Sequence, residues 1–262
     1  MMLTPALASM SLALALAVAL PAQTPTGFLD RSITVGTLRM QYQVYVPLDY
    51  DGHRKLPVIL FMHGSGERGS DGLKQTQVGM PSQIRWHRDW FNAIVVMPQC
   101  PDDSVFRGTA AQAAFATFEK SVQEFHGDRD RLYVTGLSMG GYGVWQQLLD
   151  HPNVFAAAVT VSGGLTASAD MADLFVDTKG HEPFGYVAQH VRQLPVWMFH
   201  GALDDVVPPV QDRTLVDSLR AAGGSPKYTE YPDVNHGAWD KAYGDQELWT
   251  WLFAQRLART SR

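Results

Sequence analysis

Cysteine is almost absent from this sequence, because Cys100 is the only one in 262 residues. A single cysteine forms no disulfide within the chain and builds no cysteine cage around a metal ion. Its setting in MPQCP, at the end of an expected strand, favours a small buried residue over a catalytic thiol. The nine histidines show no HExxH or comparable ligand spacing. We therefore expect no metal and no other cofactor.

Basic residues are neither abundant nor clustered. The chain has 21 Lys and Arg against 26 Asp and Glu, which gives a net charge of −5, and it contains no basic run. Nucleic-acid-binding proteins carry a basic patch or stripe, so we expect no nucleic-acid partner. Hydrophobic residues make up 45% of the chain, which is ample for a buried core. With no internal repeat and no linker, the sequence predicts one domain over residues 23–262.

The first segment is almost entirely Ala, Leu, Val and Met. Its apolar stretch from Ser11 to Leu20 is too short to span a bilayer, and it ends in small residues. This pattern predicts a secretory signal peptide over residues 1–22, with cleavage after Ala19 or Ala22. No Lys or Arg precedes the apolar stretch, so an uncleaved apolar leader or anchor is the alternative. We expect a secreted or periplasmic protein with no stable membrane insertion after signal removal.

Short runs of apolar and β-branched residues recur along the rest of the chain. Continuous runs of this kind are typical of parallel strands that are buried on both faces. They are LPVILFMHG, AIVVMPQ, RLYVTG, AAAVTVSGG and LPVWMFHG. By contrast, RSITVGTLRMQYQVYVP alternates apolar and polar residues, which predicts two antiparallel edge strands. YTEYP is the expected last strand.

Helical patterns lie between these runs. One helical face is formed by Ala111, Ala114, Phe115, Phe118, Val122 and Phe125. A second helix is expected from Gln211 to Ala222, where two glycines stop it, and a last one from about Gln246 to Leu257. Strands that alternate with helices predict right-handed crossovers. The expected fold class is therefore α/β, with a doubly wound, mostly parallel sheet and helices on both faces.

The motif GLSMG spans Gly136 to Gly140, after a strand-like run and before a helical one. A nucleophile elbow needs this arrangement, because its serine sits on a strained strand-to-helix turn. Glycines two residues on either side let the backbone close in without Cβ clashes. Ser138 is therefore the candidate nucleophile. The alternative is a glycine-rich turn with a solvated serine.

Two further motifs supply partners for this serine. HGALDDVVP places Asp204 at the end of a strand that follows the nucleophile, where ligand sites of open α/β sheets lie. VNHGAW places His236 in a loop after the expected last strand. The order Ser, Asp, His along the chain is typical of α/β hydrolases rather than of chymotrypsin or subtilisin. We predict Ser138, Asp204 and His236 as a catalytic triad.

HGSGERG follows the strand-like run PVILFM. An oxyanion hole needs two backbone N–H donors, one after the nucleophile and one from the loop after the third strand. These conditions select the amides of Met139 and Ser65. His63 and His200 each precede a glycine at a strand end. We interpret both as structural histidines that bond nearby loop backbone rather than as bases.

Taken together, HGSGERG, PQCP, GLSMGGYG, HGALDDVVP and HGAW resemble one branch of the α/β-hydrolase superfamily. This branch contains poly(3-hydroxybutyrate) depolymerase-like proteins and feruloyl and acetylxylan (carbohydrate) esterases, with dienelactone hydrolases and small carboxylesterases as more distant relatives. The resemblance extends from about Tyr45 to Trp239. It implies a serine ester hydrolase that forms an acyl-enzyme. It also assigns the acid to Asp204, four residues after His200, rather than to Asp205.

The segment over residues 167–193 is longer than in the compact pattern of this branch. It holds Met171 and three aromatic residues, Phe175, Phe184 and Tyr186. These aromatic rings are candidate substrate contacts that stack on a ring or wall a small pocket. The alternative is that they pack the segment onto the core.

Two more candidate substrate contacts are Trp239 and the glutamine of PQCP, Gln99, which follows Pro98. The resemblance implies short or aromatic acyl esters as substrates, either of carbohydrates or of small polyester fragments. The substrate is expected as a small molecule or borne on a polymer. A serine peptidase of the same fold and a non-catalytic binding protein on a hydrolase scaffold are the alternatives.

Overall fold

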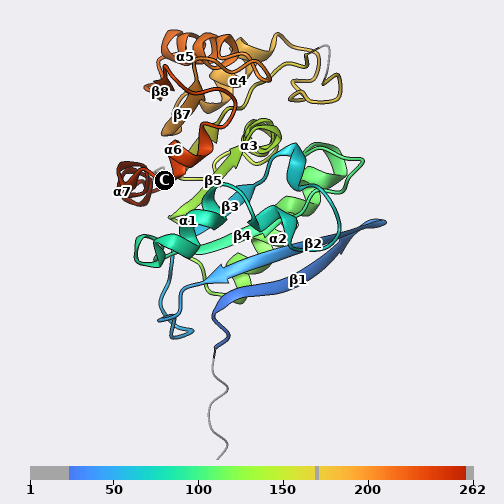
Figure 1. Cartoon of the computed structure of the whole chain (residues 1–262), viewed down its shortest axis with the longest axis vertical. Helices are drawn as coiled ribbons and strands as arrows, with labels where there is room; N and C mark the ends of the chain where they lie inside the picture. Colours follow the sequence, from blue (N-terminus) through green and yellow to red (C-terminus); the bar gives the residue numbers. More distant parts are fainter. Residues whose placement is uncertain (1–23, 169–170, 258–262) are drawn as a thin grey trace, which may run out of the picture.

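The structure is a computed structural model that describes residues 24–168 and 171–257. The predicted signal peptide over residues 1–22 lies outside the described residues. The described strands form one eight-stranded sheet in the order β1-β2-β4-β3-β5-β6-β7-β8, which runs from the bottom to the top of Figure 1. The strands are β1 (Gly27–Val35), β2 (Leu38–Val46), β3 (Val58–Met62), β4 (Ile94–Pro98), β5 (Leu132–Leu137), β6 (Ala157–Val161), β7 (Val196–Gly201) and β8 (Lys227–Tyr231).

Strand directions divide the sheet into two parts. β1 pairs antiparallel with β2, and β2 pairs antiparallel with β4. All pairings from β4 through β3 and on to β8 are parallel. Each strand-like run in the sequence forms a strand, and the alternating run forms the antiparallel edge. The predicted doubly wound, mostly parallel sheet is therefore confirmed.

Helices cover both faces of the sheet. They are α1 (Met80–Trp86), α2 (Gly108–Glu124), α3 (Met139–Asp150), α4 (Pro183–Val191), α5 (Val210–Ala221), α6 (Trp239–Tyr243) and α7 (Gln246–Ala254). One core cluster joins the sheet to α2, α3, α4 and α5, and the second joins it to α1, α6 and α7. Short 3₁₀ turns lie at η1 (Ser65–Glu67), η2 (Lys74–Thr76) and η3 (Arg88–Trp90).

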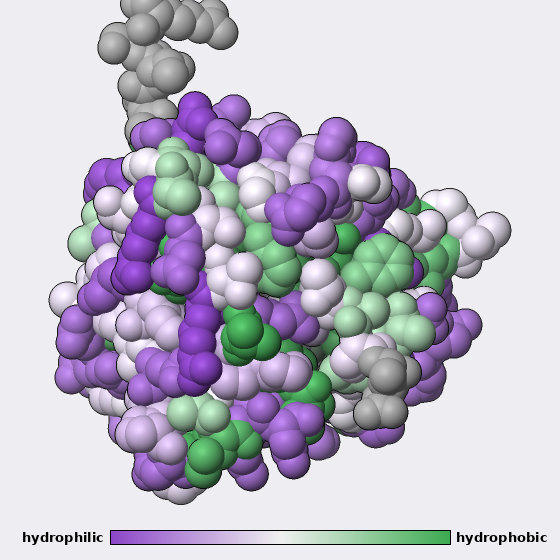
Figure 2. Space-filling model, turned by 90° about the horizontal axis from the view of Figure 1, so that it is seen from above, coloured by the Kyte–Doolittle hydropathy of each residue, from purple (hydrophilic) through white to green (hydrophobic). Residues whose placement is uncertain are grey.

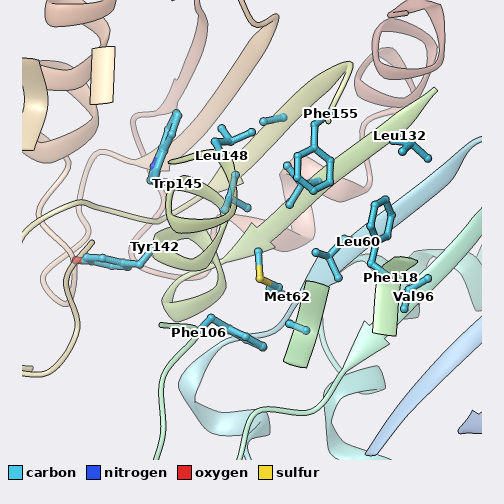
Figure 3. Packing of buried hydrophobic residues seen from close by; sticks show 14 of the residues in the cluster. Leu60, Met62, Val96, Phe106, Phe118, Leu132, Tyr142, Trp145, Leu148 and Phe155 are labelled. Atoms are coloured by element: carbon cyan, nitrogen blue, oxygen red, sulfur yellow. The ribbon is translucent and has the colours of Figure 1, made fainter. Parts of the chain in front are cut away.

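The alternation of side chains along β3 explains why the core has two halves. Leu60 and Met62 belong to the first cluster, together with Phe118 of α2 and Trp145 of α3, whereas Phe61 belongs to the second. Figure 3 shows Leu60 and Met62 among these aromatic side chains. Successive side chains of a strand point to opposite faces, so a strand covered on both sides must be apolar throughout.

Helix ends depart from the sequence prediction at the C-terminus. The last helix was expected to reach Leu257, but α7 ends at Ala254 and Gln255 has extended backbone angles. The reason is tertiary, because the Leu257 amide donates to the carbonyl of Asp130 at 2.8 Å and its side chain packs against the second cluster. That contact pulls the chain out of the helix.

Three helices of nine residues or fewer, α1, α4 and α6, were not identified from the sequence. The start of α4 nevertheless carries a recognisable signal. Its N-cap Glu182 accepts hydrogen bonds from the amides of Phe184 and Gly185, and Pro183 occupies the first turn. This Glu-Pro pair lies within the unusually long segment over residues 167–193.

The start of α3 packs backbone against backbone. A Cβ atom on Gly140 would overlap the carbonyl oxygen of Met62, and one on Gly136 would overlap the carbonyl of Gly140. Gly141 lies against Gly163 in the same way. These glycines therefore permit the close approach of α3 to the strand ends, as the GLSMG pattern predicts.

We expect Gly140→Ala to lower the free energy of unfolding by about 3 kcal/mol or more, because backbone rather than a side-chain end blocks the new methyl group. Urea unfolding followed by circular dichroism measures the change. Gly66→Ala is the matched control, since a Cβ there meets no atom within 4 Å. Equal stability of the two variants would contradict the close-packing interpretation.

Candidate active site

Ser138 occupies the sharp turn between β5 and α3. Its backbone angles are φ 48° and ψ −119°, a region that residues with side chains rarely adopt. The turn is held by the Ser138 amide, which donates to the carbonyl of Val161 at 2.9 Å. Only 7% of the residue is exposed. The strained strand-to-helix turn predicted from GLSMG is present.

His236 lies in the loop between β8 and α6 and faces the serine. Its Nε2 is 2.9 Å from Oγ of Ser138. The side chain remains 18% exposed. Trp239 packs against the imidazole edge-on, with ring centroids 5.3 Å apart, so one side of the ring is restrained by an aromatic wall.

Asp204 completes the hydrogen-bonded series. Its Oδ2 accepts from Nδ1 of His236 at 2.8 Å, while Oδ1 accepts from the amides of Val206 and Val207 at 3.0 and 2.9 Å. The Asp204 side chain is fully buried, whereas Asp205 is exposed.

The charge of Asp204 follows from its surroundings. Burial alone would raise the pKa of this carboxyl, but hydrogen bonds from His200, His236 and the Val207 amide hold its pKa well below the usual range. Asp204 is therefore a carboxylate, which keeps the hydrogen of His236 on Nδ1. Nε2 is then free to accept the hydroxyl proton of Ser138.

The loop after β3 lies beside the serine. A Cβ on Gly64 would be 3.7 Å from the Cβ of Ser138. In the described part of the chain, the amides of Ser65 and Met139 donate to no other group, and Met139 opens α3. First-turn amides of a helix have no partner within the helix and attract negative charge. Both amides are thus available to an oxyanion, and their role remains a prediction.

The two histidines interpreted as structural differ in their partners. Nδ1 of His63 lies 2.6 Å from the carbonyl of Gly64, and its Nε2 accepts from the Cys100 amide at 2.9 Å. Burial lowers the pKa of His63 to about 4, so this ring is neutral. His63 bonds loop backbone as expected. His200 also contacts two carboxylates, those of Asp204 and Asp212, which the sequence did not predict.

The expectation that Gln99 contacts substrate is wrong. The residue is 1% exposed and its amide is engaged within the protein. Oε1 accepts from the Gly72 amide at 2.6 Å, and Nε2 donates to Asp71 at 2.9 Å. Gln99 therefore braces the loop that follows the glycine-rich HGSGERG motif.

The aromatic residues of the segment over residues 167–193 have three different environments. The Phe175 ring is 38% exposed and lies under the guanidinium of Arg107, 3.8 Å from the ring centroid. Phe184 packs against the first core cluster, as does Met171. Tyr186 stacks on His181 with ring centroids 4.8 Å apart, and it packs at a tilt against His190 with centroids 4.2 Å apart. Residues 169–170 lie outside the described residues.

Within residues 24–168 and 171–257, no group of three His, Cys, Asp or Glu side chains is arranged to hold a metal ion. In the same residues no helix has the length and apolar character needed to cross a membrane. On the face drawn in Figure 2, hydrophobic residues form separate patches between hydrophilic ones. That face shows no broad apolar surface.

Comparison with known proteins identifies the family. The model of the prolyl oligopeptidase family matches residues 110–257, more than half of the chain. The chain belongs to the prolyl oligopeptidase family. The matched span contains Ser138, Asp204 and His236 but not the loop with Ser65. By family and fold the protein is an α/β hydrolase, which confirms the superfamily predicted from the motifs.

Three known proteins illustrate the similarity. An uncharacterised secreted protein of Arthroderma benhamiae is 27% identical and aligns with 71% of this chain but 22% of its own. Feruloyl esterase B of Thermothelomyces thermophilus is 25% identical over 85% of this chain and 84% of its own. The crystal structure of a thermostable esterase has a TM-score of 0.72 at 30% identity, over 87% of this chain and 63% of that one. The chain thus spans about a fifth of the first relative and under two thirds of the last.

We expect a fluorophosphonate probe to label Ser138 covalently in the wild-type protein, because its hydroxyl lies within hydrogen-bonding distance of His236. Ser138→Ala should abolish labelling while the thermal unfolding curve stays close to that of the wild type. Mass spectrometry of the labelled peptides locates the modified residue. Labelling of another serine in the variant would contradict the assignment.

The two adjacent aspartates give a matched pair of variants. Asp204→Asn should lower kcat for p-nitrophenyl acetate on the order of 10⁴-fold, because the histidine loses the carboxylate that fixes its tautomer. Asp205→Asn should leave kcat unchanged, since that side chain is exposed. Steady-state kinetics at saturating substrate distinguish the two variants. A larger loss in Asp205→Asn would show that the acid has been assigned to the wrong residue.

Proposed function

We propose that this α/β hydrolase cleaves carboxylic esters through an acyl-enzyme formed on Ser138. The observation that carries the proposal is the continuous series from Asp204 through His236 to Ser138, with distances of 2.8 and 2.9 Å. It ends on a serine held in a strained turn. This is the arrangement of an activated nucleophile, with a base beside it and a third group that orients the base.

Acylation follows from the positions of these groups. Nε2 of His236 takes the proton of the Ser138 hydroxyl as the oxygen attacks the ester carbonyl. The carboxylate of Asp204 stabilises the imidazolium that forms. The developing oxyanion accepts hydrogen bonds from the amides of Met139 and Ser65, each contributing about 3 kcal/mol to the transition state. His236 then returns the proton to the leaving alcohol.

Deacylation uses the same groups with water in place of the serine. His236 removes a proton from the water as it attacks the acyl-enzyme, and the acid product leaves when Ser138 regains its proton. No metal or organic cofactor takes part in this scheme. The 18% exposure of the His236 side chain is consistent with access for water.

Support for ester rather than amide substrates comes from the relatives of comparable length. Feruloyl esterase B is matched over 84% of its chain. The peptidases of similar fold are longer, since this chain covers 35% of a putative dipeptidyl aminopeptidase IV from Bacteroides ovatus at 18% identity. A serine peptidase is nevertheless the second candidate, because the family model is that of the prolyl oligopeptidases.

The proposed substrates are short or aromatic acyl esters of carbohydrates or of small polyester fragments. A cavity of about 740 Å³ lies next to the proposed oxyanion loop, because Arg68, which lines it, also donates to the Ser65 carbonyl at 3.1 Å. Asp173 and Arg107 line the same cavity. Charged side chains of both signs suit a hydroxyl-rich alcohol better than a long acyl chain.

Two aromatic rings extend this assignment. Trp239 is packed edge-on against His236 and is only partly buried, so it is the proposed wall for the acyl group. Phe175 is exposed, and its position is held by Arg107, whose guanidinium donates to the carbonyls of residues 173 and 175. Phe175 is the proposed stacking surface for a ring of the substrate.

We further propose that the protein acts outside the cytoplasm, on an ester that is a small molecule or part of a polymer. The predicted signal peptide over residues 1–22 supports this location, as does the similarity to a secreted fungal protein. The proposal includes no nucleic-acid partner and no stable membrane insertion, and it treats residues 23–262 as one catalytic domain.

The substrate proposal is tested by kcat/KM on p-nitrophenyl esters from acetyl to palmitoyl, alongside methyl ferulate and acetylated xylose. We expect acetyl and feruloyl esters to exceed palmitoyl by about a hundredfold or more, because each poorly accommodated group costs one to three kcal/mol. Ser138→Ala measures background hydrolysis. A maximum at long chains would contradict the acyl preference, and faster cleavage of peptide p-nitroanilides would favour the peptidase.

A further inference from the structure

The carboxylate of Asp204 has a second histidine neighbour besides His236. Nε2 of His200 lies 3.1 Å from Oδ2 of Asp204, the same oxygen that accepts from His236. The side chains of His200 and Asp204 are both fully buried. The proposed acid is therefore enclosed between two imidazole rings.

The other nitrogen of His200 also faces a carboxylate. Nδ1 lies 2.8 Å from Oδ2 of Asp212, which belongs to the first turn of α5. Asp212 is fully buried, and its Oδ1 has no hydrogen-bond partner in the described part of the protein. β7, β8 and α5, which hold these groups, lie together at the top of Figure 1.

The hydrogen-bond partners fix the protons of His200. Its Nε2 faces the Val207 carbonyl at 2.9 Å and the Asp204 carboxylate. Both are acceptors, so Nε2 carries a hydrogen. Burial opposes a charge on this ring, but the bonds to Asp204 and Asp212 raise the pKa of His200 to about 10. Burial raises the pKa of Asp212, while its hydrogen bond with His200 lowers it. We assign the proton that lies between them to Nδ1 of His200, which makes the ring an imidazolium beside the Asp212 carboxylate.

We infer that His200 and Asp212 form a second histidine–aspartate pair that positions the carboxylate of Asp204 for His236. The inference rests on the proposed triad and adds positioning residues to it. His200 contacts Oδ2 of the acid as an ion-pair partner at 3.1 Å, and the amides of Val206 and Val207 donate to its Oδ1. The cation also offsets part of the negative charge of Asp204, so this carboxylate attracts positive charge less strongly than an isolated one would.

Other ionisable groups around the pair are neutral or neutralised. Glu230 of β8 lies opposite His200 in the strand register and forms an ion pair with Arg213 at 2.7 Å. Burial raises the pKa of Tyr142, which approaches from α3, to about 12. Burial and the bond to Glu230 raise the pKa of Tyr228 on β8 as well. Neither tyrosine supplies charge near neutral pH.

His200→Gln tests the pair, because glutamine retains an N–H donor but carries no charge. Removal of the cation leaves the negative charge of Asp204 less compensated, which favours the charged form of its neighbour in the triad. The acid limb of the kcat/KM profile should therefore move to higher pH by about one unit. We expect kcat to fall about tenfold, the order of loss seen when an orienting partner is removed. KM should change little.

Asp212→Asn gives a second, independent readout. In the wild-type background it should lower kcat, because His200 loses its counterion. In the His200→Gln background it should have no further effect. There the buried, unpaired Asp212 takes up a proton, and asparagine resembles a protonated aspartate in shape and charge. If the losses of kcat in His200→Gln and Asp212→Asn were strictly additive in the double variant, the proposed pair would be contradicted.

Asp217→Asn on the same helix is the matched control, since its side chain is 82% exposed, and it should leave the pH profile unchanged. Active-site titration with the fluorophosphonate corrects each rate for misfolded protein. In Ser138→Ala, ¹⁵N NMR should show His200 protonated on both nitrogens at neutral pH. A neutral His200 would overturn the inference even if His200→Gln failed to fold.

The outcomes separate this inference from the proposed function. A wild-type protein that hydrolyses no ester and takes no fluorophosphonate would refute the function, whatever the state of His200. An active wild type whose His200→Gln variant keeps the acid limb in place would refute the positioning pair alone.

Discussion

The contact between the first turn of α3 and the end of β3 determines where the groups of the site lie. Gly140 packs directly on the carbonyl of Met62, with no room for a side chain. That contact holds Ser138 in its left-handed turn and places the loop with Ser65 beside it. The proposed nucleophile, Ser138, and the proposed oxyanion donor at Ser65 come from segments more than 70 residues apart, and this backbone packing brings them together.

Electrostatics then depend on one buried carboxylate. Asp204 is removed from water, which is costly for a charge unless donors surround it. The structure supplies two amides and two imidazoles, and the second imidazole has its own counterion in Asp212. Because the pair behind Asp204 is neutral as a whole, the acid stays ionised without a large excess of buried charge. The same residues that are buried at this edge of the sheet are those proposed to orient the base.

The strands and most of the longer helices were predictable from the sequence, as was the proximity of the three proposed triad residues, and particular residues show why. The apolar runs of β3 to β7 are buried on both faces, so their local composition is enough to predict that they are buried strands. Ser138, Asp204 and His236 follow three strands whose carboxyl ends meet at one edge of the sheet, so chain order brings them together. The prediction for Gln99 was wrong because a polar residue within a motif suggests contact with substrate. Here its side-chain amide instead forms hydrogen bonds that hold a loop.

What the sequence determined by itself was periodic or local: the alternation along strands, the glycines of the elbow and the order of the triad. Tertiary structure alone decided the end of α7, where the amide of Leu257 finds the Asp130 carbonyl. It also decided the partners of His200. No periodicity relates the end of β7 to Asp212 in the first turn of α5. Their bond exists because the packing of α5 buries both side chains away from water, where His200 contacts the carboxylates of Asp212 and Asp204.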